Sequence, residues 1–277
     1  MIDYESLDEG NHRVACPTCG RGGRDKTLGI KVEGDGNAVA HCFRCEFTES
    51  YRPQSNVRHL RIAKPVERAA SVQKHTTLSE YGRSLFNACE PISGEATAYL
   101  QARNCVIPPK DGDLRSHPSL KHAGGYIGPC LVALITDAIT GDPLSLHRTW
   151  IKPDGTKADV EPTRLLLKNH RKAGGVIRLW PDDSVTMGLA IAEGIETALS
   201  LAHAFTPVWS CIDAGNLASF PVLDGIESLV IGADNDEAGI KAARECATRW
   251  AIASKSVRII EPDTQRSDLN DLVREAA

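Results

Sequence analysis

The sequence lacks the features that mark several classes of protein. Aromatic residues make up only 5% of its 277 residues. No apolar run approaches the ~18–20 residues that a membrane-spanning helix needs, so no membrane partner is expected. The first residues, MIDYESLDEG, are acidic and have no apolar core, so we expect no signal peptide and a cytoplasmic protein. A phosphate-binding loop of the form G-x4-G-K-[ST] is also missing, which predicts that this chain carries no helicase motor.

Charge is unevenly distributed along the chain, although the formal net charge is only -4. Residues 1–50 carry a net charge of -3, residues 51–178 carry +8, and residues 179–277 carry -9. A basic segment followed by an acidic one predicts a surface that binds polyanions beside a carboxylate-rich site that holds cations. Chance clustering of solvated charges is the alternative.

Composition and hydrophobic pattern predict a multi-domain α/β protein. Nine cysteines are too few for a disulfide scaffold of this length, and four of them form two tight pairs. The predicted division is a cysteine-containing domain over residues 1–50, a basic linker over 51–77, a mixed α+β subdomain over 78–184, and a parallel-sheet α/β domain over 185–277.

Local patterns support the two larger domains. Helical patterns lie near 78–88 and 94–103, and the second one ends before the pair Pro108–Pro109. Residues 120–180 alternate β-rich runs with turn residues, which predicts mostly antiparallel strands. In the last third, short apolar strands alternate with helical patterns, as in βαβ units on a parallel sheet.

The two cysteine pairs predict a structural zinc site. The ligands would be Cys16, Cys19, Cys42 and Cys45, arranged as C-x2-C, 22 intervening residues, and C-x2-C. Four thiolates in a tetrahedral array select zinc and leave no open coordination position. The turn residues 34–37 lie between two alternating segments, which predicts a β-hairpin and hence a zinc β-ribbon. His41 could compete as a ligand, although a surface position in the hairpin is the simpler interpretation.

Acidic residues follow three predicted strands of the last third. They are Glu193, then Asp234 and Asp236, then Asp268 and Asp271. Ligands of open α/β sheets bind outside the carboxyl ends of the strands, so these side chains are expected to converge there. Carboxylates suit Mg²⁺, which promotes phosphoryl transfer. Alternatively, Asp234 is an ordinary helix-capping residue and Glu196 an ordinary exposed helix residue.

These residues resemble a known family. A zinc ribbon, a basic linker, a mixed subdomain and a terminal EG…DxDxxG domain occur in this order in the Toprim primases of bacteria and bacteriophages. The segments LAIAEGIETALSL and LVIGADNDEAG are similar to the two signature stretches of the Toprim domain. The likeness extends over nearly the whole chain and is looser in its middle. It is closest to phage- or plasmid-borne proteins without a helicase domain.

The resemblance implies roles for individual residues. Glu193, Asp234 and Asp236 would hold the catalytic Mg²⁺ or Mn²⁺, joined by Asp268, with Asp271 as a close rival. The middle subdomain would supply basic groups to nucleotide phosphates and template. The candidates are Arg148, Lys168, Arg171, Lys172 and Arg178, each of which could instead lie on a solvated basic face. Ordinary polar or core roles are expected for His147 and His170.

The implied function is synthesis of short RNA primers on a single-stranded DNA template. The ribbon would help to choose the template sequence, NTPs would be the substrates, and a separate replicative helicase would unwind the DNA in the bacterial host. Two alternatives remain: a Toprim nuclease, and a non-catalytic recombination mediator that combines a cysteine cluster with a Toprim domain. A topoisomerase is disfavoured because nothing marks the domain that would carry a nucleophilic tyrosine.

Overall fold

The computed structural model describes residues 2–22, 25–53, 75–265 and 267–275. The chain divides into two compact units, Met1–Arg68 and Ala69–Ala277. Most of the predicted linker over 51–77 falls on residues 54–74, which lie outside the described residues. No helix in the described ranges combines the length and hydropathy that crossing a membrane requires.

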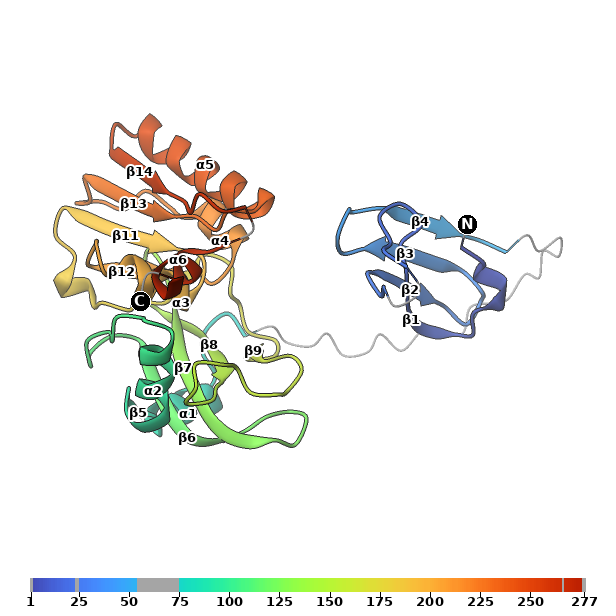
Figure 1. The fold of residues 1–277 in the computed structure, drawn as a ribbon, viewed down its shortest axis with the longest axis horizontal. Helices are drawn as coiled ribbons and strands as arrows, with labels where there is room; N and C mark the ends of the chain where they lie inside the picture. The colour runs from blue at the N-terminus through green and yellow to red at the C-terminus, as the bar shows by residue number, and fades with distance from the viewer. Residues whose placement is uncertain (1, 23–24, 54–74, 266, 276–277) are drawn as a thin grey trace. The chain divides into compact units, whose positions relative to one another are not determined.

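The first unit is built on a four-stranded antiparallel sheet (Figure 1). A short 3-10 helix, η1 (Tyr4–Ser6), precedes strands β1 (Gly10–Val14), β2 (Leu28–Val32), β3 (Ala38–Cys42) and β4 (Thr48–Tyr51), which pair in sequence order. The predicted hairpin is confirmed as β2–β3. The strands β1 and β4 extend it on both sides, so the predicted boundary at residue 50 falls inside β4.

Alternation of side chains explains the hairpin. On β2 and β3, every second residue is buried and packs into one small core, and the residues between them face outward. In the connecting turn, the Asp35 carboxylate accepts the backbone N–H of Asn37 at 3.0 Å. Gly36 has a φ of 80°, a left-handed conformation that favours glycine.

The second unit begins with the mixed subdomain. Its elements are α1 (Glu80–Asn87), β5 (Glu90–Pro91), α2 (Gly94–Ala102), β6 (Leu114–Lys121), β7 (Ile127–Asp137), β8 (Pro143–Trp150), β9 (Arg164–Leu166) and β10 (Gly175–Val176). The strands form one antiparallel sheet in the order β5-β6-β7-β8-β9, with β10 paired to β7. Both predicted helices and the antiparallel pattern are confirmed.

A parallel sheet follows, as the βαβ pattern predicted. A short 3-10 helix, η2 (Asp182–Ser184), leads into β11 (Gly188–Ala192), α3 (Ile195–Leu201), β12 (Val208–Ser210), α4 (Ala214–Ser219), β13 (Ser228–Gly232), α5 (Glu237–Ile252), β14 (Ser256–Ile260) and α6 (Leu269–Glu275). The strand order is β12-β11-β13-β14, and all three pairings are parallel. The fold class is therefore the predicted one.

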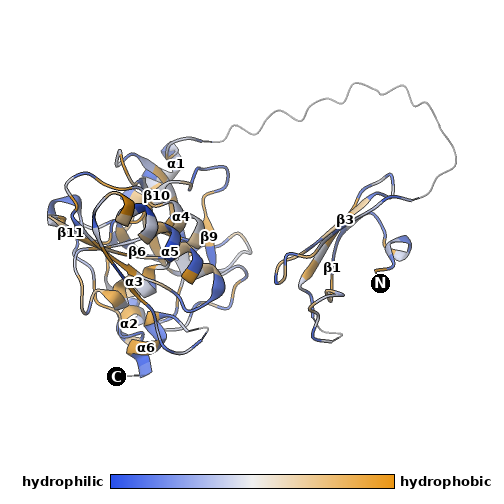
Figure 2. Cartoon of the chain, turned by 90° about the horizontal axis from the view of Figure 1, so that it is seen from above, coloured by the Kyte–Doolittle hydropathy of each residue, from blue (hydrophilic) through white to orange (hydrophobic). Residues whose placement is uncertain are grey.

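Helices cover both faces of this sheet (Figure 1). Leu189 and Ile191 of β11 pack with α4 and α5, whereas Ala190 and Ala192 pack with α3, α6 and the mixed subdomain. The helix α5 is amphipathic and shows both hydrophobic and hydrophilic colours in Figure 2. Its buried residues are Gly239, Ala242, Ala243, Cys246 and Trp250, a spacing that forms one apolar stripe. Because helices cover both faces, a site can form only along the ends of the strands, and this row of strand ends is the edge referred to below.

Candidate functional site

The carboxyl ends of the parallel strands place the predicted acidic residues along one edge. Glu193 follows β11, Asp234 and Asp236 follow β13, and Asp268 comes after β14, just before α6. Since β11 and β13 are neighbours, their two loops lie side by side. The structure therefore brings these four residues, which lie up to 75 positions apart in the sequence, to the same end of the sheet.

Burial and like charge perturb two of these carboxyl groups. Burial, then the charges of Asp234, Asp236 and Asp213, raise the pKa of Glu193 to about 7. Burial, then the charges of Asp268 and Asp236, raise the pKa of Asp234 to about 6. Burial is the largest cause of each rise, and the like charges add a repulsion that a bound cation would relieve. Oxygen ligands of this kind fit Mg²⁺ or Mn²⁺.

Local hydrogen bonds fix the loop after β13. Asp236 is the N-cap of α5, and its Oδ1 accepts the N–H of Gly239 at 2.8 Å. The Thr197 hydroxyl donates to Oδ1 of Asp234 at 3.4 Å. A Cβ at Gly239 would lie 2.6 Å from the Asp234 carbonyl oxygen, so glycine is needed for α5 to start this close to the loop. The spacing of the DxDxxG motif thus has a steric cause.

The loop before α6 favours Asp268 over Asp271 as the fourth carboxylate. Asp268 contributes to the raised pKa of Asp234, and the N–H of Asn235 donates to the carbonyl of Ser267, next to Asp268, at 2.9 Å. Asp271 instead donates its N–H to Oδ1 of Asp268 at 2.9 Å and accepts the N–H of Asp268 at 3.3 Å. The assignment to the metal site stays a prediction.

Asp213 belongs to the same edge and was missed in the sequence. It follows β12, caps α4 by accepting the N–H of Asn216 at 2.9 Å, and forms an ion pair with Lys172 at 2.7 Å. Its charge helps to raise the pKa of Glu193. The signal that could have found it is its position directly after a predicted strand, which it shares with Glu193 and Asp234.

Two predicted basic residues are engaged by the protein itself. Arg178 is 8% exposed, donates to Thr136, Asp182 and the carbonyls of residues 137 and 138, and lies over Trp209. Arg148 donates to the Leu166 carbonyl at 3.0 Å. Both side chains therefore stabilise the fold where they stand.

The other predicted basic residues lie nearer to solvent. Arg171 pairs with Asp137 at 2.6 Å, Lys172 pairs with Asp213, and Lys168 is exposed. Of the two histidines, His170 accepts the N–H of Ser79 at 3.1 Å. Burial, then the charges of Arg164, Lys157 and Arg148, lower the pKa of His147 to about 4.

A second cluster, also missed in the sequence, lies between the mixed subdomain and α3. Glu196 is 6% exposed rather than on a solvated helix face. Its carboxylate accepts the Tyr99 hydroxyl at 2.8 Å and pairs with Arg164 at 3.3 Å and Lys157 at 3.7 Å. No local pattern could reveal it, because Tyr99 precedes Glu196 by 97 residues.

The two cysteine pairs of the first unit form a cluster of metal-ligand geometry. Their sulfur atoms all lie within 4.8 Å of one another. The distances from Cys16 to Cys45 and from Cys19 to Cys42 are 3.7 and 3.6 Å. A tetrahedron with Zn–S bonds of about 2.3 Å has sulfur–sulfur edges of about 3.8 Å, so the cluster fits zinc. Across the described ranges, no other set of three or more such ligands is this close.

An exposed aromatic side chain adjoins this cluster. Phe43 is 64% exposed, the Arg13 guanidinium lies 4.4 Å from its ring centroid, and the His41 ring meets it edge-on at 4.9 Å. A Cβ at Gly29 would lie 2.9 Å from the Phe43 ring, so the ring lies directly over this glycine. The outer face of the sheet therefore presents an apolar ring flanked by basic groups.

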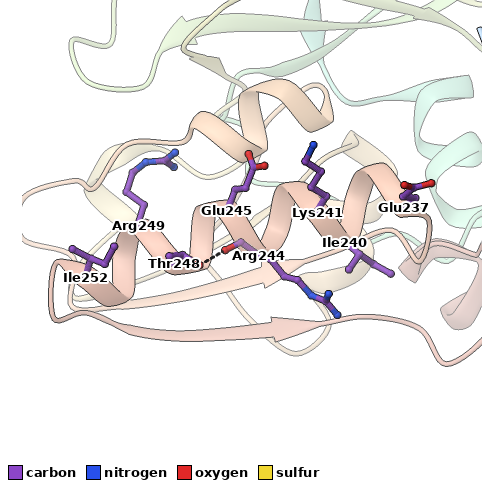
Figure 3. Close-up of a pocket in the computed structure, with 8 residues that line it drawn as sticks. All are labelled: Glu237, Ile240, Lys241, Arg244, Glu245, Thr248, Arg249 and Ile252. Carbon is purple, nitrogen blue, oxygen red and sulfur yellow. Dashed lines mark hydrogen bonds between the residues drawn. The ribbon is translucent and has the colours of Figure 1, made fainter. Parts of the chain in front are cut away.

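A groove of about 960 Å³ lies elsewhere, along α5 from Glu237 to Ile252 (Figure 3). None of the acidic site residues lines it.

Comparison with known proteins agrees with this geometry. Residues 188–277 match the Toprim domain family, and residues 76–179 match a domain of unknown function, DUF7146. The chain thus combines a Toprim domain with a zinc-type cluster of four cysteines. No curated protein matches it.

Three solved primase structures are similar to the chain at low identity. A DNA primase domain from Pseudomonas aeruginosa has 14% identity and a TM-score of 0.45, covering 70% of this chain and 74% of its own. The primase fragment of the bacteriophage T7 primase-helicase protein has 17% identity and a TM-score of 0.44, covering 96% and 95%. The zinc-binding and RNA polymerase domains of the Aquifex aeolicus primase have 13% identity and a TM-score of 0.44, covering 98% and 78%.

Proposed function

We propose that the protein is a DNA primase that makes short RNA primers on single-stranded DNA by metal-dependent nucleotidyl transfer. The observation that carries the proposal is that Glu193, Asp234, Asp236 and Asp268 all follow strands at one end of the parallel sheet, in a chain that matches the Toprim domain family and also has a four-cysteine ribbon. Like-charge repulsion at this edge supports a cation as its occupant.

The acidic edge would hold Mg²⁺ or Mn²⁺. Such ions, when bound, neutralise charge on the attacking and leaving oxygens of phosphoryl transfer. In the protein, Asp236 and Asp234 are fixed by the start of α5, and the Ser210 hydroxyl donates to the Glu193 carbonyl at 2.9 Å. Carboxylates held on strand ends suit this role because the elements that carry them are rigid.

Cations beside this edge would bind the phosphates of NTPs and template. Burial and nearby carboxylates raise the pKa of Asp234, and the charge of Arg164 offsets part of that rise, so Arg164 acts at the acidic edge. The exposed residues Lys168, Arg171 and Lys172 are proposed template contacts. Arg148 and Arg178 donate to backbone carbonyls, so we assign them to the support of the sheet.

The first unit would bind the template. Zinc held by the four cysteines would fix the ribbon, and the exposed Phe43 ring with the Arg13 guanidinium over it offers a DNA base an apolar and cationic contact surface. A separate helicase would unwind the duplex, since the chain has no phosphate-binding loop of the motor type.

The test is primer synthesis from single-stranded DNA, four NTPs and Mg²⁺ or Mn²⁺. The wild type should make short RNA products, and Asp234→Asn should abolish them. Glu245→Gln is the matched control, because Glu245 lies on the exposed side of α5 and should leave synthesis unchanged. Products that survive Asp234→Asn would show that the acidic edge is not the catalytic site.

Other outcomes point to the alternatives. DNA cleavage without primers would favour the nuclease, and DNA binding with neither reaction would favour the recombination mediator. Metal analysis of the purified protein tests zinc separately: the wild type should contain one zinc per chain, and Cys42→Ser should lose it.

A further inference from the structure

Glu196 is a buried carboxylate that the proposed chemistry does not use. It lies three residues after Glu193, in the first turn of α3, with 6% of its surface exposed. Its partners come from three segments of the mixed subdomain: Tyr99 on α2, Lys157 in the β8–β9 connection, and Arg164 at the start of β9. The carboxylate thus joins the mixed subdomain to the Toprim domain.

The two cations are only partly covered by this contact. The side chain of Lys157 is 26% exposed and that of Arg164 is 44% exposed. Glu196 contacts Arg164 through Nη2 alone, at 3.3 and 3.4 Å, and a guanidinium has five N–H donors in a fixed fork. Both side chains are therefore partly open to solvent.

The cluster has more positive than negative groups, so it could bind an anion. One carboxylate faces two cations directly, and Arg103 adds a third positive charge: burial, then the charges of Arg164 and Arg103, lower the pKa of Lys157. These cations adjoin the acidic edge, because Glu196 follows Glu193 by three residues and the hydroxyl of the next residue, Thr197, donates to Oδ1 of Asp234 at 3.4 Å. Positive groups beside metal-binding carboxylates match the phosphates of a metal-bound nucleoside triphosphate.

A structural ion pair alone explains this arrangement poorly. A buried carboxylate is desolvated, and replacing a buried ion pair by apolar residues is often neutral or stabilising. A pair that served only to join two domains would gain nothing from keeping its cations at the solvent edge. An ion pair that positions cations for a ligand needs those cations at the solvent edge. Cations that are already held in place lose less conformational entropy when the ligand binds.

We propose that Glu196 is a positioning residue that fixes Arg164 and Lys157 to receive the phosphates of the incoming nucleoside triphosphate. This inference rests on the proposed function and adds which residues bind the phosphates of the substrate. Glu196 itself touches no substrate and acts through its two cations.

The test is Glu196→Gln, which keeps the size of the side chain and an acceptor for Tyr99 but removes the charge. The KM for NTP should rise about tenfold or more, the scale of a charge-assisted hydrogen bond, while kcat changes far less. Glu196→Asp, which keeps the charge, should restore part of the affinity. Asp159→Asn is the matched control, because it breaks the exposed Lys152–Asp159 pair in the same connection and should leave KM unchanged.

Direct binding separates this inference from the primase proposal. Fluorescence titration with mant-ATP requires no primer synthesis, so it reports on the cations even if no primers form. The effects of Glu196→Gln and Arg164→Gln should be less than additive in the double variant, because one acts through the other. If Glu196→Gln lowers the melting temperature but leaves mant-ATP affinity unchanged, the role is structural and the proposal is wrong.

The proposal can still be tested if Glu196→Gln fails to fold. Arg164→Gln and Lys157→Gln alter partly exposed side chains, and each should weaken mant-ATP binding about tenfold. Unchanged binding in both would overturn the proposal.

Discussion

Asp236 carries two functions that a single pair of variants can separate. Its Oδ1 caps α5 by accepting the N–H of Gly239 at 2.8 Å, and its negative charge raises the pKa of Glu193 and Asp234. Asparagine caps helices about as well as aspartate, whereas alanine cannot. Asp236→Asn should therefore remove the charge and keep the cap, and Asp236→Ala should remove both.

The two variants should differ in stability without metal. Loss of the cap in Asp236→Ala should lower the free energy of unfolding by ~1 kcal/mol. Asp236→Asn should be at least as stable as the wild type, because it keeps the hydrogen bond and relieves repulsion on two carboxylates that are already perturbed. Urea unfolding of the metal-free protein measures both values.

Addition of Mn²⁺ then tests the charge. A ligand at 100 times its Kd stabilises a protein by about 2.7 kcal/mol, and the wild type should show a gain of this kind. Asp236→Asn should lose most of it, and the control Glu245→Gln should keep it. Equal destabilisation of the Asn and Ala variants would refute the capping argument, and an undiminished Mn²⁺ effect in Asp236→Asn would refute the metal site.

Three further predictions follow from other contacts. Phe43→Ala should weaken binding of single-stranded DNA by ~1–3 kcal/mol in fluorescence anisotropy, with zinc content unchanged, whereas the neighbouring exposed Val39→Ala should have little effect. Gly239→Ala should destabilise the protein by about 1–3 kcal/mol and abolish Mn²⁺ stabilisation, since its Cβ would displace the Asp234 carbonyl; normal values for both would contradict the steric argument. His147, whose pKa falls from 6.5 to about 4 on folding, contributes stability that is complete above pH 6.5 and declines as the pH falls toward 4. The free energy of unfolding of the wild type should thus fall relative to His147→Gln by about 1–3 kcal/mol over that interval, and parallel curves would contradict it.

The sequence was informative where a pattern has local causes. The cysteine spacing predicted the ribbon, because two tight turns must present four thiolates together. The strand–carboxylate alternation predicted the acidic edge, because parallel strands share one carboxyl end. In both cases the functional side chains lie within a few residues of the turns or strands that position them.

The sequence was uninformative about residues whose contact partners lie far away along the chain. The strands Gly10–Val14 and Thr48–Tyr51 are short and largely polar, so only pairing with the hairpin reveals them. Arg178 looked like a nucleotide contact, yet its partner carbonyls lie about 40 residues earlier. Glu196 looked exposed because its cover comes from Tyr99 and the mixed subdomain. Tertiary packing decides such positions.

The docking of α6, the last helix that the structure describes, sets the order in which the acidic edge can assemble. Asn270 is fully buried and donates to the Arg103 carbonyl at 2.8 Å and the Ser200 hydroxyl at 3.0 Å. A Cβ at Gly232 would lie 2.9 Å from Leu269, so the helix also packs closely on β13. During synthesis from the N-terminus, Asp268 joins the other carboxylates only once this helix has left the ribosome and docked. Until then the acidic edge lacks one of its four carboxylates.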